Sequence, residues 1–116
     1  MRIHLDTGRS GEKLAAEWLS QRGYTILACN WKYGRKEIDI IASLDNILHF
    51  IEVKTRRGHG FGMPEEQVTR KKLKNIKTAA EAYLETFPQW RRVQFDIVSI
   101  IYAPGGHNIQ LLEDIS

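Results

Sequence analysis

The sequence predicts an α/β fold in which a mixed β-sheet is flanked by helices, with the element order α-β-β-β-α-β-β. Two runs rich in β-branched residues, Ile38–Ala42 and Ile47–Val53, are separated by a short turn-forming segment around Asp45, which is typical of a β-hairpin. Segments with helical spacing precede and follow this hairpin. The second helical segment is long enough to allow a parallel pairing of the strand that follows it.

Length and composition set the frame for this fold. A chain of 116 residues is expected to form one domain over residues 1–116 with a single core, and residues 1–7, which carry no pattern, are expected to be disordered. Its 42% hydrophobic and 27% charged residues are ordinary for a globular protein. No apolar run approaches the length of a membrane span and no signal-peptide pattern is present, so we expect a cytoplasmic protein without a membrane partner. The lone cysteine, Cys29, is expected to be a small core residue.

The first helix is expected to run to about Arg22, where Gly23 ends it, and to begin near a capping residue, Asp6, Thr7 or Ser10. Glu12 precedes the apolar positions Ala15 and Ala16 by three and four residues, so it belongs to the inward stripe of this helix. A glutamate in the first turns of a helix also favours the helix dipole, which is the alternative interpretation. A first strand is predicted over Tyr24–Trp31.

The hairpin has a register that follows from its turn. Asp45 and Asn46 suit a two-residue turn because both residue types tolerate positive φ. That turn places Asp39 opposite Glu52 and Glu37 opposite Lys54. Since side chains alternate along a strand, these four project from one face. The opposite face would carry an apolar set, Ile38, Ile40, Ile51 and Val53.

Opposed carboxylates repel each other, so folding alone gives no reason to place Asp39 beside Glu52. A bound Mg²⁺ or Mn²⁺ does give a reason, because hard oxygen ligands hold it through one or two carboxylates and substrate phosphate. Lys54 beside them would position a water or stabilise developing charge. The alternative is a cross-strand salt bridge in which Lys54 neutralises the carboxylates on a solvated face.

The second half of the chain is expected to contain one helix and two strands. Pro64 suits the first position of a helix that ends at Phe87-Pro88. The last two strands are predicted over Val93–Tyr102 and Ile109–Leu112, with a turn containing Pro-Gly-Gly between them.

Positive charge brackets the carboxylate pair, although the formal net charge is only +3. Such a distribution favours a phosphate-rich substrate whose reacting phosphate meets a metal. A basic helix face can equally be a solvated surface. The nucleic-acid-binding candidates are Arg35, Lys36, Arg56, Arg57, Arg70, Lys72, Lys74 and Lys77.

Asp39 followed by Glu52-Val53-Lys54 on the next strand resembles the D…ExK signature of the restriction-endonuclease-like, or PD-(D/E)xK, nucleases. Glu12 is similar to the extra acidic residue of archaeal Holliday-junction resolvases. Over residues 8–114 the chain resembles the bacterial YraN-type family. The matching residues include Gly11-Glu12, Gly23-Tyr24, Glu37-Ile38-Asp39, Phe50–Lys54, Pro64-Glu65, Val68-Thr69, Lys72 and Phe95-Asp96. The chain departs from the family at Lys36 and Gln94, where glycine and arginine are usual.

The resemblance implies a restriction-endonuclease-like fold and a metal-dependent endonuclease that hydrolyses DNA phosphodiesters, including those of branched or junction DNA. Asp39, Glu52, Lys54 and Glu12 would be catalytic, and the metal would be held by Asp39, Glu52 and the backbone carbonyl of Val53. Gln67 is a further candidate for water or phosphate contact. The alternatives are a non-catalytic nucleic-acid-binding module acting with a partner protein, and a structural adaptor. Both a homodimer and a complex with another protein are compatible with the sequence.

Overall fold

The described residues form two helices and five strands in the predicted order. The structure is a computed structural model and describes residues 7–57 and 69–115. The helices are α1 (Thr7–Gln21) and α2 (Arg70–Thr86). The strands are β1 (Thr25–Tyr33), β2 (Lys36–Leu44), β3 (Ile47–Arg57), β4 (Val93–Ala103) and β5 (Gly106–Leu112). The expectation about residues 1–7 falls almost wholly outside the described residues.

One mixed sheet has the strand order β1-β2-β3-β4-β5. Strands β3 and β4 are parallel, and the other neighbouring pairs are antiparallel. The parallel pairing requires a long crossover, which contains α2, as the sequence predicted. The turn between β4 and β5 is shorter than expected, because Ala103 pairs with Gly106. Strand β5 therefore begins before Ile109, the expected first residue.

The predicted β2–β3 hairpin turn is confirmed. Asp45 and Asn46 have φ values of 52° and 67°, as a two-residue turn with left-handed central residues requires. The pairing runs from Leu44 opposite Ile47 to Ile40 opposite Ile51, in the predicted register.

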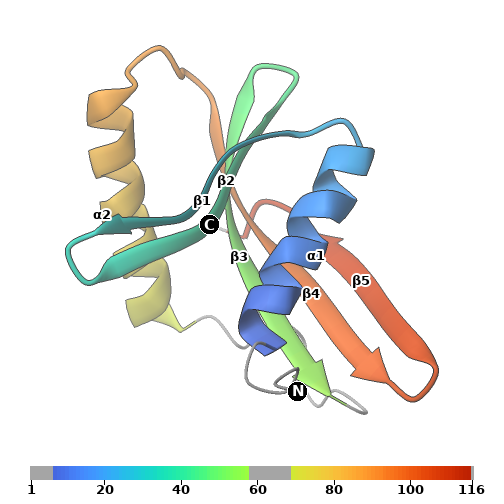
Figure 1. The fold of residues 1–116 in the computed structure, drawn as a ribbon. Helices are drawn as coiled ribbons and strands as arrows, with labels where there is room; N and C mark the ends of the chain where they lie inside the picture. Colours follow the sequence, from blue (N-terminus) through green and yellow to red (C-terminus); the bar gives the residue numbers. More distant parts are fainter. Residues whose placement is uncertain (1–6, 58–68, 116) are drawn as a thin grey trace.

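Beyond Ile40 the predicted pairing is wrong, because β2 and β3 separate. Figure 1 shows the β1–β2 hairpin turning away from β3 towards α2, so the expected positions of Asp39 opposite Glu52 and Glu37 opposite Lys54 are not paired. The β1–β2 pairing also skips Asn30, which has a left-handed φ of 53°, and Asp39. The pleat is interrupted there.

This interruption changes the face on which Ile38 packs. Ile40, Ile51 and Val53 pack in the core beside α1, which agrees with the prediction that these three residues share one face. Ile38 instead packs in the core beside α2, with Ile41 and Phe50. The prediction that Ile38 shares a face with Ile40 is therefore wrong.

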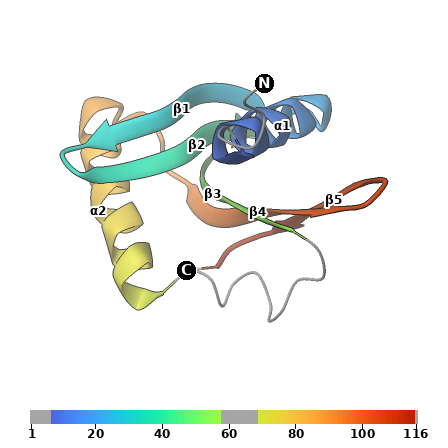
Figure 2. The same cartoon turned by 60° about the horizontal axis from the view of Figure 1, so that its bottom comes forward.

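Two hydrophobic clusters attach the helices to opposite faces of the sheet (Figure 2). The α1 cluster is built around Ala15 and Leu19, and the α2 cluster around Ile76, Ala80 and Tyr83. Neighbouring residues of β3 serve different clusters, because strand side chains alternate. Strand β3 is thus buried on both faces.

The end of α1 follows the predicted signal at Gly23. Gly23 has a φ of 98°, its N–H donates to the Ser20 carbonyl, and the Tyr24 N–H donates to the Leu19 carbonyl. This is the Schellman arrangement, and the accompanying apolar contact is present because Leu19 and Tyr24 share the α1 cluster.

The start of α2 differs from the expected start at Pro64. Thr69 has an extended backbone, with φ −71° and ψ 165°, and its side chain accepts a hydrogen bond from the Lys72 N–H at 3.1 Å. Thr69 is therefore the N-cap, and the helix begins at Arg70. Pro64 itself lies outside the described residues. A second expectation is also wrong: Cys29 is exposed, because it lies on the edge strand β1.

A buried polar network holds the chain end against β4. The Asp96 side chain is fully buried and its Oδ2 lies 2.6 Å from Nδ1 of His49. Its Oδ1 accepts from the Asp114 N–H at 2.8 Å and from Gln94 at 3.0 Å. Gln94, where the resembled family usually has arginine, donates a hydrogen bond to this carboxylate.

Gly11 sets how closely α1 approaches β3. A Cβ at this position would lie 2.4 Å from Cγ2 of Thr55, closer than side chains pack. We expect Gly11→Ala to lower the free energy of unfolding by about 1–3 kcal/mol, because overpacking outweighs the gain in helix propensity.

Urea unfolding of four proteins checks this expectation: wild type, Gly11→Ala, Thr55→Ser and the double variant. Thr55→Ser removes the methyl group that the new Cβ would meet, so the double variant should recover most of the loss measured against Thr55→Ser alone. Equal losses in both backgrounds would contradict the close-approach explanation.

Candidate active site

The candidate site lies at the point where β2 and β3 separate, beyond the pair formed by Ile40 and Ile51, which we call the fork. Past the last β2–β3 pair, the Asp39 carboxylate takes over a backbone hydrogen bond: its Oδ2 accepts from the Val53 N–H at 2.8 Å. This bond holds Asp39 at the fork and close to Glu52, which follows Ile51 on β3. The carboxylates are brought together by this side-chain bond in place of a continued ladder.

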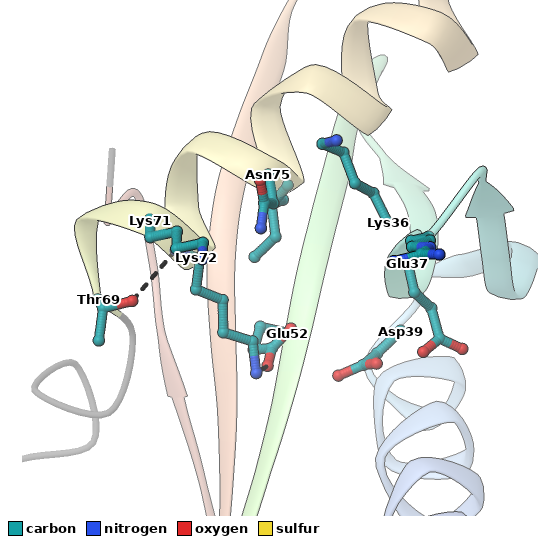
Figure 3. A pocket seen from close by; sticks show the side chains of 10 residues that line it. Lys36, Glu37, Asp39, Glu52, Thr69, Lys71, Lys72 and Asn75 are labelled. Atoms are coloured by element: carbon teal, nitrogen blue, oxygen red, sulfur yellow. Dashed lines mark hydrogen bonds and ion pairs between the residues drawn. The ribbon is translucent and has the colours of Figure 1, made fainter.

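A pocket of about 380 Å³ opens at the fork, between the β1–β2 hairpin and the first turns of α2. Figure 3 shows Asp39 and Glu52 approaching each other across it, with Lys72 reaching from α2 to Glu52. Its described lining consists of Arg35, Lys36, Glu37, Asp39, Glu52, Thr69, Lys71, Lys72, Asn75 and Ile76.

Burial and neighbouring charges act on the Asp39 carboxylate. Burial raises the pKa of Asp39 to about 7, and the nearby charge of Glu52 adds to this effect. The Val53 N–H opposes the increase, while Glu12 and Glu37 contribute to it. The fork therefore concentrates negative charge in a partly buried position, which a cation would relieve.

Two lysines already approach one oxygen of Glu52. Lys72 forms an ion pair with Glu52 Oε2, and Lys54 Nζ lies 3.7 Å from the same oxygen. Burial lowers the pKa of Lys54, and the hydrogen bond and charge of Lys72 lower it further. Partial burial also disfavours the charged form of Lys72, but its contact with Glu52 outweighs this and raises its pKa. Lys54 is thus the lysine more easily deprotonated.

Glu12 reaches the same neighbourhood from α1. It is half-buried and its charge acts on Asp39 and on Cys29 of β1. The inward orientation expected from its helical spacing therefore agrees with its position on the side of Asp39.

The predicted nucleic-acid-binding residues fall into three groups. Arg35, Lys36 and Lys72 line the pocket. Arg56 and Arg57 continue β3 beyond Lys54, outside the described lining. The remaining three border a second hollow on the outer side of α2, whose lining is Arg70, Leu73, Lys74, Lys77, Thr78 and Glu81.

The helical wall of the pocket contains residues that the sequence analysis did not select. Lys71, Asn75 and the cap Thr69 all line it. Asn75 lies three residues after Lys72, so helical spacing would have placed both on one face. Two expectations stay open: Gln67 lies outside the described residues, and the Val53 N–H bond to Asp39 does not test the Val53 carbonyl as a metal ligand.

The chemistry of the donor set fits a hard divalent cation. Asp39 and Glu52 supply carboxylate oxygens from two strands, and their mutual repulsion is what such an ion removes. No group of three His, Cys, Asp or Glu side chains suited to a metal is present among residues 7–57 and 69–115. A cation at this fork would therefore need water or substrate oxygens to complete its coordination.

Comparison with known proteins gives the chain a family. The sequence model of the group described as "Uncharacterised protein family UPF0102" matches residues 11–100, which include the fork and most of α2. The chain belongs to the UPF0102 family. This is the YraN-type family that the sequence resembles.

Relatives of the same family are similar over nearly their full length. A UPF0102 protein of Phocaeicola vulgatus is 40% identical over 114 residues, which is 98% of this chain and 94% of the relative. A UPF0102 protein of Cytophaga hutchinsonii is 45% identical over 97 residues, 84% and 86% of the two chains. One of Dictyoglomus thermophilum is 44% identical over 102 residues, 87% and 86%.

Neither α1 nor α2 is long and apolar enough to cross a membrane.

We expect Asp39→Asn to stabilise the metal-free protein at neutral and higher pH. The folded-state pKa of Asp39 is about 7, above its ordinary value of 3.8, so ionising this group destabilises the fold. The penalty is absent below about pH 4, grows as the pH rises towards 7 and is complete above it. An asparagine oxygen can still accept from Val53, so that contact is kept.

Thermal melts from pH 4 to pH 8 in the presence of a chelator check the sign. The stability difference should favour Asp39→Asn by on the order of a few kcal/mol at pH 8 and should fade towards pH 4. A variant that is less stable than wild type at pH 8 would instead identify a structural charge network at the fork.

Proposed function

We propose that this protein is a metal-dependent endonuclease that hydrolyses DNA phosphodiester bonds, with branched or junction DNA as a candidate substrate. The observation that carries the proposal is the fork, where Asp39, Glu52 and Lys72 line one pocket and Lys54 Nζ lies 3.7 Å from the Glu52 carboxylate. A DNA substrate agrees with the cytoplasmic location expected from the sequence.

Each residue has a role that its position supports. Asp39 and Glu52 would hold Mg²⁺ or Mn²⁺, with the Val53 carbonyl as a further ligand. A bound ion of this kind supplies charge neutralisation at the phosphate and acidifies water. Lys54, whose pKa is lowered by burial and by Lys72, would orient the attacking water or stabilise developing charge.

The basic residues at the rim would hold the DNA backbone. Arg35 and Lys36 approach from the hairpin, and Lys71 from the first turn of α2. Helix N-termini favour anions, so a phosphate bound there would gain from the helix dipole as well as from the lysines. Glu12 would add to the acidic side of the site through its proximity to Asp39.

A non-catalytic nucleic-acid-binding module is the second candidate. One observation that favours it is the ion pair between Lys72 and Glu52. The other is that no group of three His, Cys, Asp or Glu side chains suited to a metal is found among the described residues. In that case the protein would bind DNA and act with a partner protein, and the paired charges would serve stability. A cleavage assay separates the two candidates.

The catalytic prediction concerns Asp39→Ala, Glu52→Ala and Lys54→Ala. Each should lower the rate of Mg²⁺- or Mn²⁺-dependent cleavage by at least about 100-fold. DNA affinity measured in chelator should survive, because the phosphate contacts come mainly from other residues. Cleavage of linear, nicked, flapped and four-way-junction DNA is measured with metal and with chelator.

Glu85→Ala serves as the control, because Glu85 is an exposed acidic residue near the far end of α2. It should cut at the wild-type rate. Wild-type cutting by Glu52→Ala would refute the site assignment, and DNA binding without cleavage of any substrate would favour the binding module.

The second prediction concerns salt. For duplex DNA, log K should fall linearly with log salt concentration, with a slope of about −0.9 for each phosphate neutralised. Replacing Lys74 and Lys77 by alanine should make the slope shallower by about one to two, because both border the outer hollow of α2.

Fluorescence anisotropy at several salt concentrations measures the slope. Arg91→Ala/Arg92→Ala is the matched control, since it also removes two exposed positive charges but from the segment that follows α2. A slope that changes equally in both double variants would assign the α2 face to ordinary solvated surface.

A further inference from the structure

The contact between Lys72 and Glu52 joins a movable cation to a fixed carboxylate. The Glu52 side chain is 5% exposed and belongs to the central strand β3, whereas the Lys72 side chain is 41% exposed and extends from the first turn of α2 (Figure 3). The Lys72 backbone is held by the Thr69 cap. Its ammonium group can therefore leave Glu52 by side-chain rotation alone.

Lys72 and a divalent cation would need the same place. The ammonium is in direct contact with Oε2, and Lys54 Nζ lies 3.7 Å from this oxygen. An ion coordinated by Oε2 would meet two positive charges at short range, and their repulsion is weakly screened because the carboxylate is buried. Since Lys54 is anchored on the same strand, Lys72 is the group that has to move.

DNA offers Lys72 another partner. The first turn of α2 contains Arg70, Lys71 and Lys72 and no acidic residue, although helix N-termini disfavour cations. Lys71 lines the same pocket as Lys72. A phosphate entering this pocket would bring negative charge to the helix start, so it would compete with Glu52 for the Lys72 ammonium.

We propose that the Lys72 ammonium blocks the Glu52 carboxylate in the metal-free protein. When DNA binds, the ammonium moves from Glu52 to a DNA phosphate, and the carboxylate becomes available to a divalent metal ion. Divalent-metal binding and DNA binding are then positively coupled, and each strengthens the other by the same factor. The proposal rests on the proposed metal-dependent function. It adds that Lys72 opposes metal binding until DNA is present.

The test is Mn²⁺ binding in the absence of DNA, measured by the electron paramagnetic resonance signal of free Mn²⁺ at constant ionic strength. Lys72→Met keeps the apolar stem and removes the charge. It should bind Mn²⁺ about ten-fold more tightly than wild type, within the usual range of coupling between sites. Lys72→Arg keeps the charge and should stay close to wild type.

Lys71→Met is the matched control, because it removes a charge from the same pocket and leaves the Lys72–Glu52 pair in place. It should change Mn²⁺ affinity by less than about three-fold. An equal gain in Lys71→Met and Lys72→Met would overturn the proposal, because general electrostatics would then explain both. Thermal melts without metal verify that the variants are folded.

A second measurement follows the coupling itself. The affinity for a dye-labelled phosphorothioate duplex is measured with and without Mn²⁺, and Mn²⁺ should strengthen binding by wild type much more than binding by Lys72→Met. Equal Mn²⁺ affinities of wild type and Lys72→Met would overturn this inference and leave the nuclease proposal intact. If neither protein binds Mn²⁺ with or without DNA, the metal-dependent function falls, and this inference falls with it.

Discussion

The hydrogen bond from the Val53 N–H to the Asp39 carboxylate is the interaction on which the site depends. It stands where the β2–β3 ladder stops, and it satisfies a backbone donor that the departing strand no longer pairs. An apolar residue at position 39 would leave that N–H without this acceptor. The same carboxylate therefore completes the sheet and supplies charge to the pocket, which ties the local fold to the chemistry.

The separation of the strands is maintained by the two hydrophobic clusters. Ile40 and Ile51 pack against α1, whereas Ile38, only two residues away from Ile40, packs against α2. The hairpin is thus drawn towards one helix while β3 stays beneath the other. The pocket between them is a consequence of this division of the core, and α2 closes it with Lys71, Lys72 and Asn75.

Local chemistry was sufficient to predict much of this arrangement. The turn at Asp45 and Asn46 set the register near the turn, and Gly23 marked the end of α1, because both depend on backbone conformations that few residues adopt. The predicted convergence of Asp39, Glu52 and Lys54 is present, although through a fork and not through a continuous ladder.

The remaining features depend on tertiary packing. The side on which Ile38 packs is decided by α2, which lies far along the sequence. The reach of Lys72 to Glu52 requires the position of α2 relative to β3, and its start at Thr69 was hidden by the stronger helix signal of Pro64. No pattern within one element contains that information.

The Thr69 cap and the central strand β3 differ in how firmly they are held. Leu48 to Glu52 are buried between two neighbouring strands, whereas Thr69, Arg70 and Lys71 are exposed at the beginning of their helix. Segments with few buried contacts open locally at lower free energy than central strands. The acidic half of the pocket therefore belongs to the most protected part of the molecule and the basic half to one of its less protected parts, so access to the carboxylates can change while the sheet stays folded.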